Sequence, residues 1–238
     1  MIMKKLLFSL LTLITFVFSS CNDGEEGTHA YQKFVTVKTL ESPNYYFEMD
    51  NKKTIYPVNK SNVIYAPKEG QRAILLFSLE DLGKFSQEEQ KDLKQYDYLA
   101  TIYQIQNIYT GAVESMPISE TEQQQNDPLD IVDAVLVGDW LTIRVLHPFT
   151  SETKNKHSYK VVYDENAFEA NSNYINLTLI HNAGDDPQDG SSYYNDISFN
   201  TLSIDQFLAS KKGVKITYKR LQTMKTETIT IDRPTEKQ

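Results

Sequence analysis

The chain has 238 residues and a net charge of −8, with 32 acidic side chains against 24 basic ones. Binding to a phosphate backbone needs clustered Lys and Arg, so this acidity argues against nucleic acid as a partner. The length is sufficient for one large hydrophobic core or two smaller ones. Cys21 is the only cysteine, which excludes a disulfide within the chain and a thiolate metal site.

Residues 1–20 have the pattern of a secretory signal peptide, with Lys4 and Lys5 ahead of the apolar run Leu6–Phe18. This run is shorter than the about 20 residues that span a bilayer. Cys21 follows at the expected cleavage point, and the segment resembles a bacterial lipobox, although Phe18 stands where Leu is usual. We therefore expect acylated Cys21 to anchor the protein to the membrane. An ordinary secretory signal with an unmodified cysteine is the alternative.

Residues 21–30 form an acidic, polar segment that we interpret as a flexible tether. Residues 31–118 then contain five runs rich in β-branched and aromatic residues, which predict antiparallel strands. Ser86 and Glu89 make a capping box, which predicts a short helix from Gln87 to about Gln95. These elements match an OB-like barrel. The five runs are 34–39, 45–49, 54–58, 72–79 and the long run 98–109.

Residues 119–129 are polar, and apolar residues do not recur in them at the spacing of a helix or a strand. We interpret them as a linker between two domains. Residues 130–238 contain seven further strand-like runs, with a short helical turn expected around Ile204 to Ala209. Seven short strands at this spacing predict a β-sandwich. The fold class is therefore all-β, with an N-terminal OB-like barrel and a C-terminal β-sandwich. The seven runs are 131–137, 140–147, 157–163, 174–181, 193–199, 214–221 and 226–231.

Several short motifs, in this order and spacing, resemble the NigD-like lipoproteins of Bacteroidetes. The likeness extends from the lipobox to about Leu202 and implies an OB-like domain followed by a β-sandwich. It implies no reaction, because the biochemical role of the family is not established. The motifs are Tyr65-Ala-Pro-Lys-Glu-Gly-Gln-Arg72, Asn126-Asp-Pro-Leu-Asp-Ile131, Gly138-Asp-Trp-Leu-Thr-Ile143 and Leu179-Ile-His-Asn-Ala183.

The same resemblance bears on cellular location. Many lipoproteins of this phylum carry an acidic stretch after the acylated cysteine that directs them to the cell surface. Asp23, Glu25 and Glu26 are similar to that stretch, with Gly24 interrupting it. We expect an outer-membrane lipoprotein exposed at the cell surface, with a periplasm-facing lipoprotein as the alternative.

No nucleophile elbow, zinc-protease, phosphate-loop or dinucleotide motif occurs in the sequence, and we expect no catalytic residues and no cofactor. The four histidines are His29, His147, His157 and His181. Three of them fall on different predicted strands without metal-site spacing, so we predict no histidine metal site.

The acidic segment after His181 has a weak calcium-loop pattern. Asp185, Asp189 and Asp196 fall at positions 1, 5 and 12 of such a loop, but Pro187 occupies position 3. A solvated hairpin loop explains the same residues, and we weigh calcium only as the lesser alternative.

Tyrosine doublets at Tyr45-Tyr46 and Tyr193-Tyr194 are candidates for recognition, since strand alternation sends one member of each doublet outward. Trp140, at the start of a strand, is expected in the core. We interpret the protein as a non-catalytic binding module for a protein or a glycan. The alternatives are an accessory or immunity factor in bacteriocin-type antagonism and a hydrolase acting on glycans. Its oligomeric state is not predicted.

Overall fold

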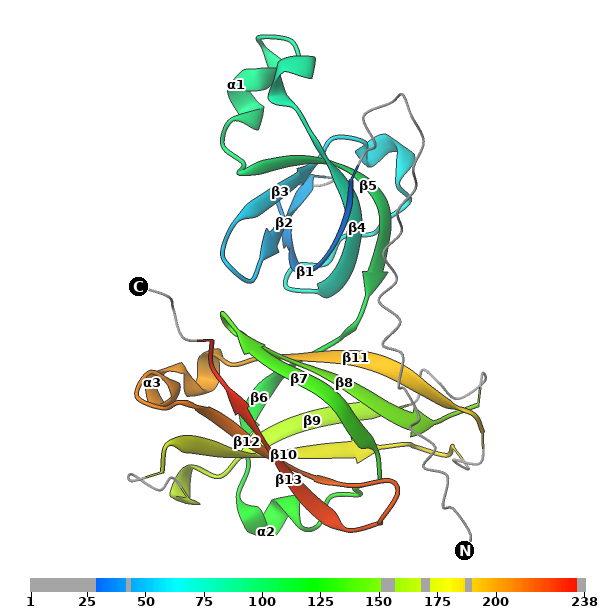
Figure 1. Ribbon diagram of the computed structural model, residues 1–238, viewed down its shortest axis with the longest axis vertical. Helices are drawn as coiled ribbons and strands as arrows, with labels where there is room; N and C mark the ends of the chain where they lie inside the picture. Colours follow the sequence, from blue (N-terminus) through cyan, green and yellow to red (C-terminus); the bar gives the residue numbers. More distant parts are fainter. Residues whose placement is uncertain (1–28, 42–43, 151–156, 168–171, 187–189, 235–238) are drawn as a thin grey trace, which may run out of the picture.

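The computed structural model describes residues 29–41, 44–150, 157–167, 172–186 and 190–234. These residues form two β-rich domains, a barrel and a sandwich, which follow one another along the chain (Figure 1). The all-β prediction is confirmed. No helix in this described part of the chain is both long and apolar enough to cross a bilayer.

The N-terminal domain is a closed barrel with the strand order β1-β2-β3-β5-β4. Its closure depends on a parallel pair between β3 and β5 and an antiparallel pair between β4 and β1. A helix, α1 (Glu89–Leu93), lies between β4 and β5 in the chain, and the predicted capping box is present at its start, where the Ser86 amide donates to Glu89 at 2.9 Å. The strands are β1 (Ala30–Thr39), β2 (Tyr45–Met49), β3 (Thr54–Pro57), β4 (Arg72–Glu80) and β5 (Tyr98–Asn107).

The domain boundary differs from the predicted linker at 119–129. The run 98–109 is not one strand, because β5 ends in the barrel at Asn107 and β6 (Tyr109–Ser115) belongs to the sandwich. The polar interval carries a short helix, α2 (Ile118–Thr121), inside the C-terminal domain. Alternation along a strand shows which side chains face inward, but it does not show where the chain exchanges one sheet for another.

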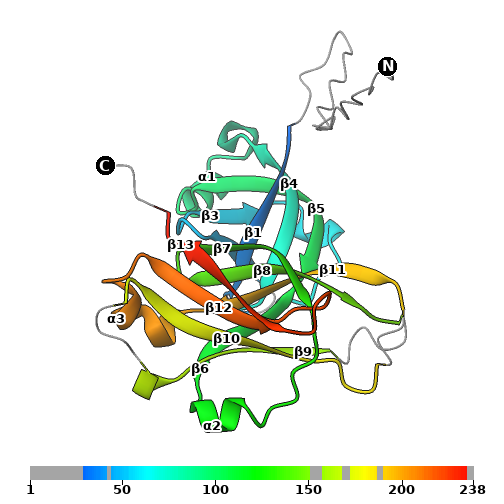
Figure 2. The ribbon, with the colours of Figure 1, turned by 60° about the horizontal axis from the view of Figure 1, so that its bottom comes forward.

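The C-terminal sheet has eight strands rather than the predicted seven, in the order β13-β12-β10-β9-β6-β11-β8-β7. The additional strand, β6, pairs in parallel with β11 through its first half and with β9 through its second half. It thereby joins the two layers of the sandwich (Figure 2). The other strands are β7 (Asp130–Val137), β8 (Trp140–Pro148), β9 (Ser158–Tyr163), β10 (Tyr174–Asn182), β11 (Ser192–Asn200), β12 (Gly213–Lys219) and β13 (Thr226–Asp232).

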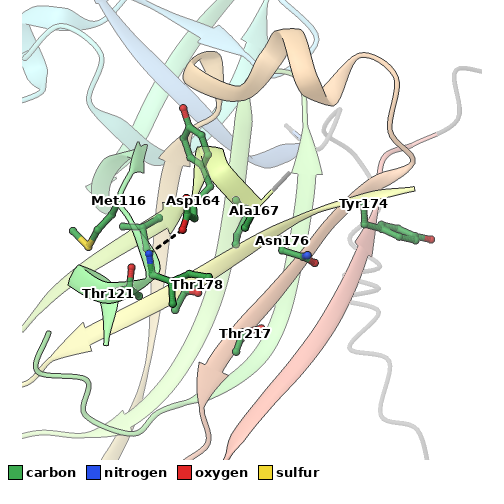
Figure 3. Close-up of a pocket in the computed structure, with 12 residues that line it drawn as sticks. Met116, Thr121, Asp164, Ala167, Tyr174, Asn176, Thr178 and Thr217 are labelled. Atoms are coloured by element: carbon green, nitrogen blue, oxygen red, sulfur yellow. Dashed lines mark hydrogen bonds between the residues drawn. The ribbon is translucent and has the colours of Figure 1, made fainter. Parts of the chain in front are cut away.

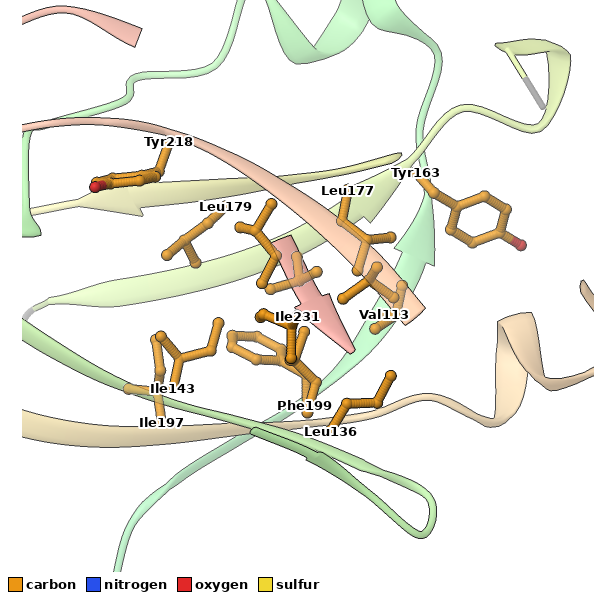
Figure 4. Close-up of a cluster of buried hydrophobic side chains, with 14 of the residues drawn as sticks. Val113, Leu136, Ile143, Tyr163, Leu177, Leu179, Ile197, Phe199, Tyr218 and Ile231 are labelled. Carbon is orange, nitrogen blue, oxygen red and sulfur yellow. The ribbon is translucent and has the colours of Figure 1, made fainter. Parts of the chain in front are cut away.

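The inward faces of these strands form the sandwich core (Figure 4). Phe199 of β11, Ile143 of β8 and Leu177 of β10 are among its fully buried side chains. The predicted helical turn is confirmed as α3 (Asp205–Leu208), which contributes Leu208 to the same core. The burial of these apolar surfaces is the main stabilising term of the domain.

The two domains meet where the turn after β2 contacts the turn between β7 and β8. Arg72 is fully buried and donates to both carboxylate oxygens of Asp50, at 2.7 and 3.2 Å. Lys52 forms an ion pair with Asp139 across the same junction. Trp140, which we predicted to be buried, is only 9% exposed and lies against Arg72. The junction is therefore a specific polar and aromatic contact rather than a loose connection.

Candidate functional site

Three of the four histidines lie together at one end of the sandwich. One ring nitrogen from each of His147, His157 and His181 lies within 4.8 Å of the others, and all three residues are buried. His29 is exposed ahead of β1. Chain spacing did not predict this histidine cluster, because its members come from β8, the residue before β9, and β10.

Strand alternation explains why His147 and His181 point into the sandwich. His147 follows Ile143 and Val145 on the inward face of β8, and all three are fully buried. His181 takes the corresponding position after Leu179 in β10. The β10–β9 register places His181 opposite Tyr159, another buried side chain. The two layers therefore each supply a histidine at the same end of the core.

A hydrogen-bonded chain connects two of the histidines to polar groups of the neighbouring loops. His157 Nδ1 lies 2.8 Å from His181 Nε2, and His157 Nε2 lies 3.3 Å from a carboxylate oxygen of Asp186. His181 Nδ1 lies 3.3 Å from the backbone carbonyl oxygen of Asp127. The Asp186 oxygen also accepts the amide of Thr150 at 3.0 Å. This arrangement orients both imidazole rings.

His147 is held by different partners. Its Nδ1 donates to the carbonyl oxygen of Pro148 at 3.1 Å, and its Nε2 accepts from the hydroxyl of Tyr159. These two bonds assign the proton to Nδ1. The ring stacks on His157 with 4.5 Å between centroids and an interplanar angle of 17°. All three imidazoles are thus packed and fixed in orientation.

Burial keeps two of these rings uncharged. Desolvation lowers the pKa of His147 to about 4 and, together with the neighbouring histidines, lowers the pKa of His181 to about 3. Desolvation also raises the pKa of Tyr159. At neutral pH the His147 and His181 imidazoles are therefore neutral, and each has a nitrogen lone pair available as an acceptor or metal ligand.

A cavity of about 420 Å³ reaches this cluster. His157 and Tyr159 line it together with the amides of Gln106, Asn107 and Asn195. It lies where the chain leaves the barrel, since β5 ends at Asn107. Its size lies within the usual range of about 300 to 1,000 Å³ for small-ligand sites.

The start of β11 borders this cavity with exposed tyrosines. Tyr194, which lines the cavity, is 65% exposed, and Tyr193 is 49% exposed. We predicted that alternation would send one of the two inward, and this is wrong, because the first residues of β11 extend beyond the core. In the other doublet Tyr45 is buried and Tyr46 is partly exposed, as predicted.

A second, smaller cavity lies beside α2 (Figure 3). Its volume is about 100 Å³, and Met116, Thr178 and Thr217 are among its lining residues. Asp164 in its wall accepts the backbone amide of Ile118 at 3.0 Å. This volume is below that of ordinary small-ligand sites, and its carboxylate already has a structural partner. We therefore consider the cavity beside the histidine cluster to be the candidate site.

The calcium candidates do not come together as a set in the described structure. Asp196 binds Arg144 through both carboxylate oxygens, at 2.9 and 3.1 Å. Asp185 is exposed in a turn, and Asp189 lies outside the described residues. The adjacent Asp186, which we did not single out from the sequence, is buried against His157. Cys21 also lies outside the described residues.

Comparisons with known proteins agree with this architecture. Residues 34–108 match the NigD-like N-terminal OB domain, and residues 113–232 match the NigD-like C-terminal beta sandwich domain. No curated protein matches the chain. These two matches also place the domain boundary near residue 110, as the strand pairing does.

Three solved structures of similar fold come from Bacteroides species. A DUF1344 protein of unknown function from Bacteroides vulgatus has a TM-score of 0.65 and 18% identity, covering 88% of this chain and 93% of its own. A protein named "Putative lipoprotein" from Bacteroides fragilis has a TM-score of 0.63 and 11% identity, covering 88% and 100%. A NigD-like immunity protein from Bacteroides caccae has a TM-score of 0.59 and 18% identity, covering 84% and 91%. At these identities the likeness shows the fold alone, whereas the two domain matches show that the chain belongs to the NigD-like family.

Proposed function

We propose that the protein is a lipid-anchored envelope protein that binds a glycan at the cavity beside the histidine cluster without cleaving it. The signal-peptide pattern with Cys21 supports the lipid anchor, as does the similar Bacteroides fragilis protein named "Putative lipoprotein". The acidic residues that follow Cys21 support a position at the outer face of the outer membrane.

The side chains that line the cavity are the main support for a glycan as the ligand. Gln106, Asn107 and Asn195 bring side-chain amides to the lining, which suits ligands that are dense in hydroxyl groups. Asn107 Oδ1 also accepts from Tyr65, and Asn195 Nδ2 lies 3.3 Å from His147 Nε2, so each keeps only part of its hydrogen-bonding capacity for a ligand. The exposed ring of Tyr194 at its border offers an apolar face with a polar hydroxyl tip. The walls of the cavity carry few charges, are rich in amides and include an aromatic ring. Such a surface suits a neutral sugar better than an ionic ligand.

The charges around the cavity support binding without hydrolysis. Glycoside hydrolysis commonly uses a pair of carboxyl groups on either side of the scissile bond. Asp196 is the only carboxylate among the residues described as lining this cavity, and Arg144 holds both of its oxygens. A carboxylate in a bidentate ion pair with Arg is poorly suited to act as nucleophile or general acid.

Equilibrium binding of the full chain to a panel of neutral oligosaccharides, measured by calorimetry, tests the proposal. Tyr194→Ala is expected to weaken binding by about 10-fold or more, because it removes the aromatic face. Tyr103→Ala is the matched control, since Tyr103 is 52% exposed on the barrel strand β5 and does not line the cavity. Equal affinity of Tyr194→Ala and wild type would contradict this site.

An immunity role is the second candidate, since a neighbour of the same fold is named a NigD-like immunity protein. It predicts that expression of this protein protects a sensitive strain against an antagonist encoded nearby. Protection that persists in Tyr194→Ala would place that activity outside the glycan site. Loss of glycan binding without loss of protection would separate the two functions.

A further inference from the structure

We infer that His147, His157 and His181 bind one divalent transition-metal ion of the zinc class at the end of the sandwich core. The inference does not depend on glycan binding, since it rests on the three imidazoles and their partners. Their ring nitrogens already lie within 4.8 Å of one another. Neutral imidazole is a preferred ligand for Zn²⁺, Cu²⁺ and Ni²⁺, whereas Ca²⁺ and Mg²⁺ prefer oxygen.

Proton accounting in the histidine cluster points to a missing positive charge. The chain from Asp186 through His157 and His181 to the Asp127 carbonyl contains three contacts, and each needs one hydrogen. Two neutral imidazoles supply only two hydrogens. Either an added proton or a metal ion must therefore complete the network. A metal ion between His157 Nδ1 and His181 Nε2 satisfies every remaining contact with both rings neutral.

The outer partners are those of metal-bound histidines. Ligating imidazoles usually donate the second ring N–H to a carboxylate or a backbone carbonyl. His157 faces the Asp186 carboxylate in this way, and His181 faces the carbonyl of Asp127. His147 donates to the carbonyl of Pro148. Each ring therefore has one nitrogen held by an outer partner. The second nitrogens of His157 and His181 face each other, whereas that of His147 is hydrogen-bonded to the Tyr159 hydroxyl and lies 3.3 Å from the Asn195 amide nitrogen.

Binding requires the rings to rearrange, and His147 must turn out of its stack on His157, where the two planes lie at 17°. Zn–N bonds of about 2.0 to 2.1 Å at tetrahedral angles separate ligand nitrogens by about 3.3 Å. His157 Nδ1 and His181 Nε2, now 2.8 Å apart, would move apart by about 0.5 Å on that estimate. His147 Nε2 would exchange the Tyr159 hydroxyl for the metal. The Asn195 amide nitrogen, now 3.3 Å from the same His147 nitrogen, would be displaced as well and can turn to the Tyr159 hydroxyl.

The cavity supplies a route for the ion. His157 and Tyr159 line it, so solvent reaches the edge of an otherwise buried cluster. Zinc sites with three protein ligands usually hold water in the fourth position.

Cobalt and zinc titrations of the untagged full chain, stripped with a chelator, test the inference. We expect one equivalent of Co²⁺ to give the intense visible bands of a tetrahedral nitrogen site, and Zn²⁺ to displace it. His147→Gln, His157→Gln and His181→Gln are each expected to weaken Zn²⁺ binding by about 100-fold or more. Calorimetry and metal analysis of the same samples give the affinity and stoichiometry.

His29→Gln is the matched control, because it removes the one histidine outside the cluster. It should keep the cobalt spectrum and the affinity of wild type, and this result supports the site even if the buried variants fail to fold. Failure of wild type to bind Co²⁺ or Zn²⁺ overturns the inference. Unchanged binding in a folded His181→Gln variant, or loss of binding in His29→Gln, does so as well.

Discussion

The guanidinium of Arg72 lies over the indole ring of Trp140, with 4.7 Å between the Arg72 Cζ and the ring centroid. This contact joins β4 of the barrel to β8 of the sandwich. The same guanidinium pairs with Asp50 through Nη1 and Nη2, so Arg72 uses both its planar fork and its stacking face at the junction. The relative position of the domains is therefore encoded in a few side chains.

Arg72→Met is expected to destabilise the protein by about 3 to 5 kcal/mol, because it leaves Asp50 without its buried partner. Urea unfolding measures the change. Lys38→Met is the control, since the Lys38–Glu69 pair is exposed at the surface and should contribute less than about 1 kcal/mol. Similar losses of unfolding free energy in the two variants would contradict this, because the Arg72–Asp50 pair would then contribute no more to stability than the Lys38–Glu69 pair.

Gly138→Ala is expected to disturb the domain junction. Gly138 has a φ of +56°, and an added Cβ would lie 2.5 Å from the backbone oxygen of Asp50 in the other domain. Gly70→Ala is the matched control, because Gly70 has a φ of +75° but open space around its Cβ position. Both variants carry the cost of about 1 kcal/mol for a side chain at positive φ.

The difference between these two glycine variants isolates the steric clash at the junction. We expect Gly138→Ala to lose more stability in urea unfolding and to increase proteolysis between the domains. Equal losses in Gly138→Ala and Gly70→Ala would contradict the close approach of the two turns.

Acid is expected to destabilise the metal-free sandwich. The folded pKa values of His147 and His181 are depressed to about 4 and about 3, whereas an unfolded histidine titrates near 6.5. Below about pH 6.5 the unfolded chain binds protons that the folded chain excludes, so stability falls as the pH falls. The loss from pH 7 to pH 5 is on the order of 2 to 4 kcal/mol.

Urea unfolding at several pH values, with a chelator present, measures this acid effect. His29→Gln should show the same pH dependence as wild type, because His29 is exposed. A stability that stays level between pH 7 and pH 5 would contradict this, because it would mean that the folded and unfolded chains take up protons equally.

Cys21→Ser is expected to move the protein from the membrane fraction to the soluble fraction of cells, because it removes the site of acylation. Mass spectrometry of the N-terminal peptide should show the acyl mass in wild type alone. Membrane retention of an unacylated Cys21→Ser variant would indicate another means of attachment.

Much of the fold was predictable because local patterns determine it. β-branched runs and a capping box predicted the barrel strands and α1, and the runs 131–137 and 140–147 predicted β7 and β8. The boundary near Ile108 was not predictable in this way. Its position depends on parallel pairing of β6 with β11 and β9, which are distant in sequence.

The histidine cluster was only partly accessible to sequence reasoning. Alternation from Ile143 through Val145 to His147, and from Leu177 through Leu179 to His181, indicates that both histidines face inward. It does not indicate that they meet, because that depends on how the two layers pack. His157 and Asp186 lie outside the strands, where the alternation of inward and outward side chains does not apply, so alternation could not place them in the cluster.

Hydroxyl-radical footprinting on intact cells is the sharpest test of glycan binding at this cavity, because the glycan does not have to be identified for the experiment to work. Tyr194 and Tyr193 are exposed in the protein alone, as is Tyr103 on the barrel. We predict that Tyr194 is protected from oxidation on cells, relative to purified protein, while Tyr103 stays reactive. Enzymatic removal of surface glycans should restore Tyr194 oxidation. Equal oxidation of Tyr194 on cells and in purified protein would contradict glycan binding at this cavity.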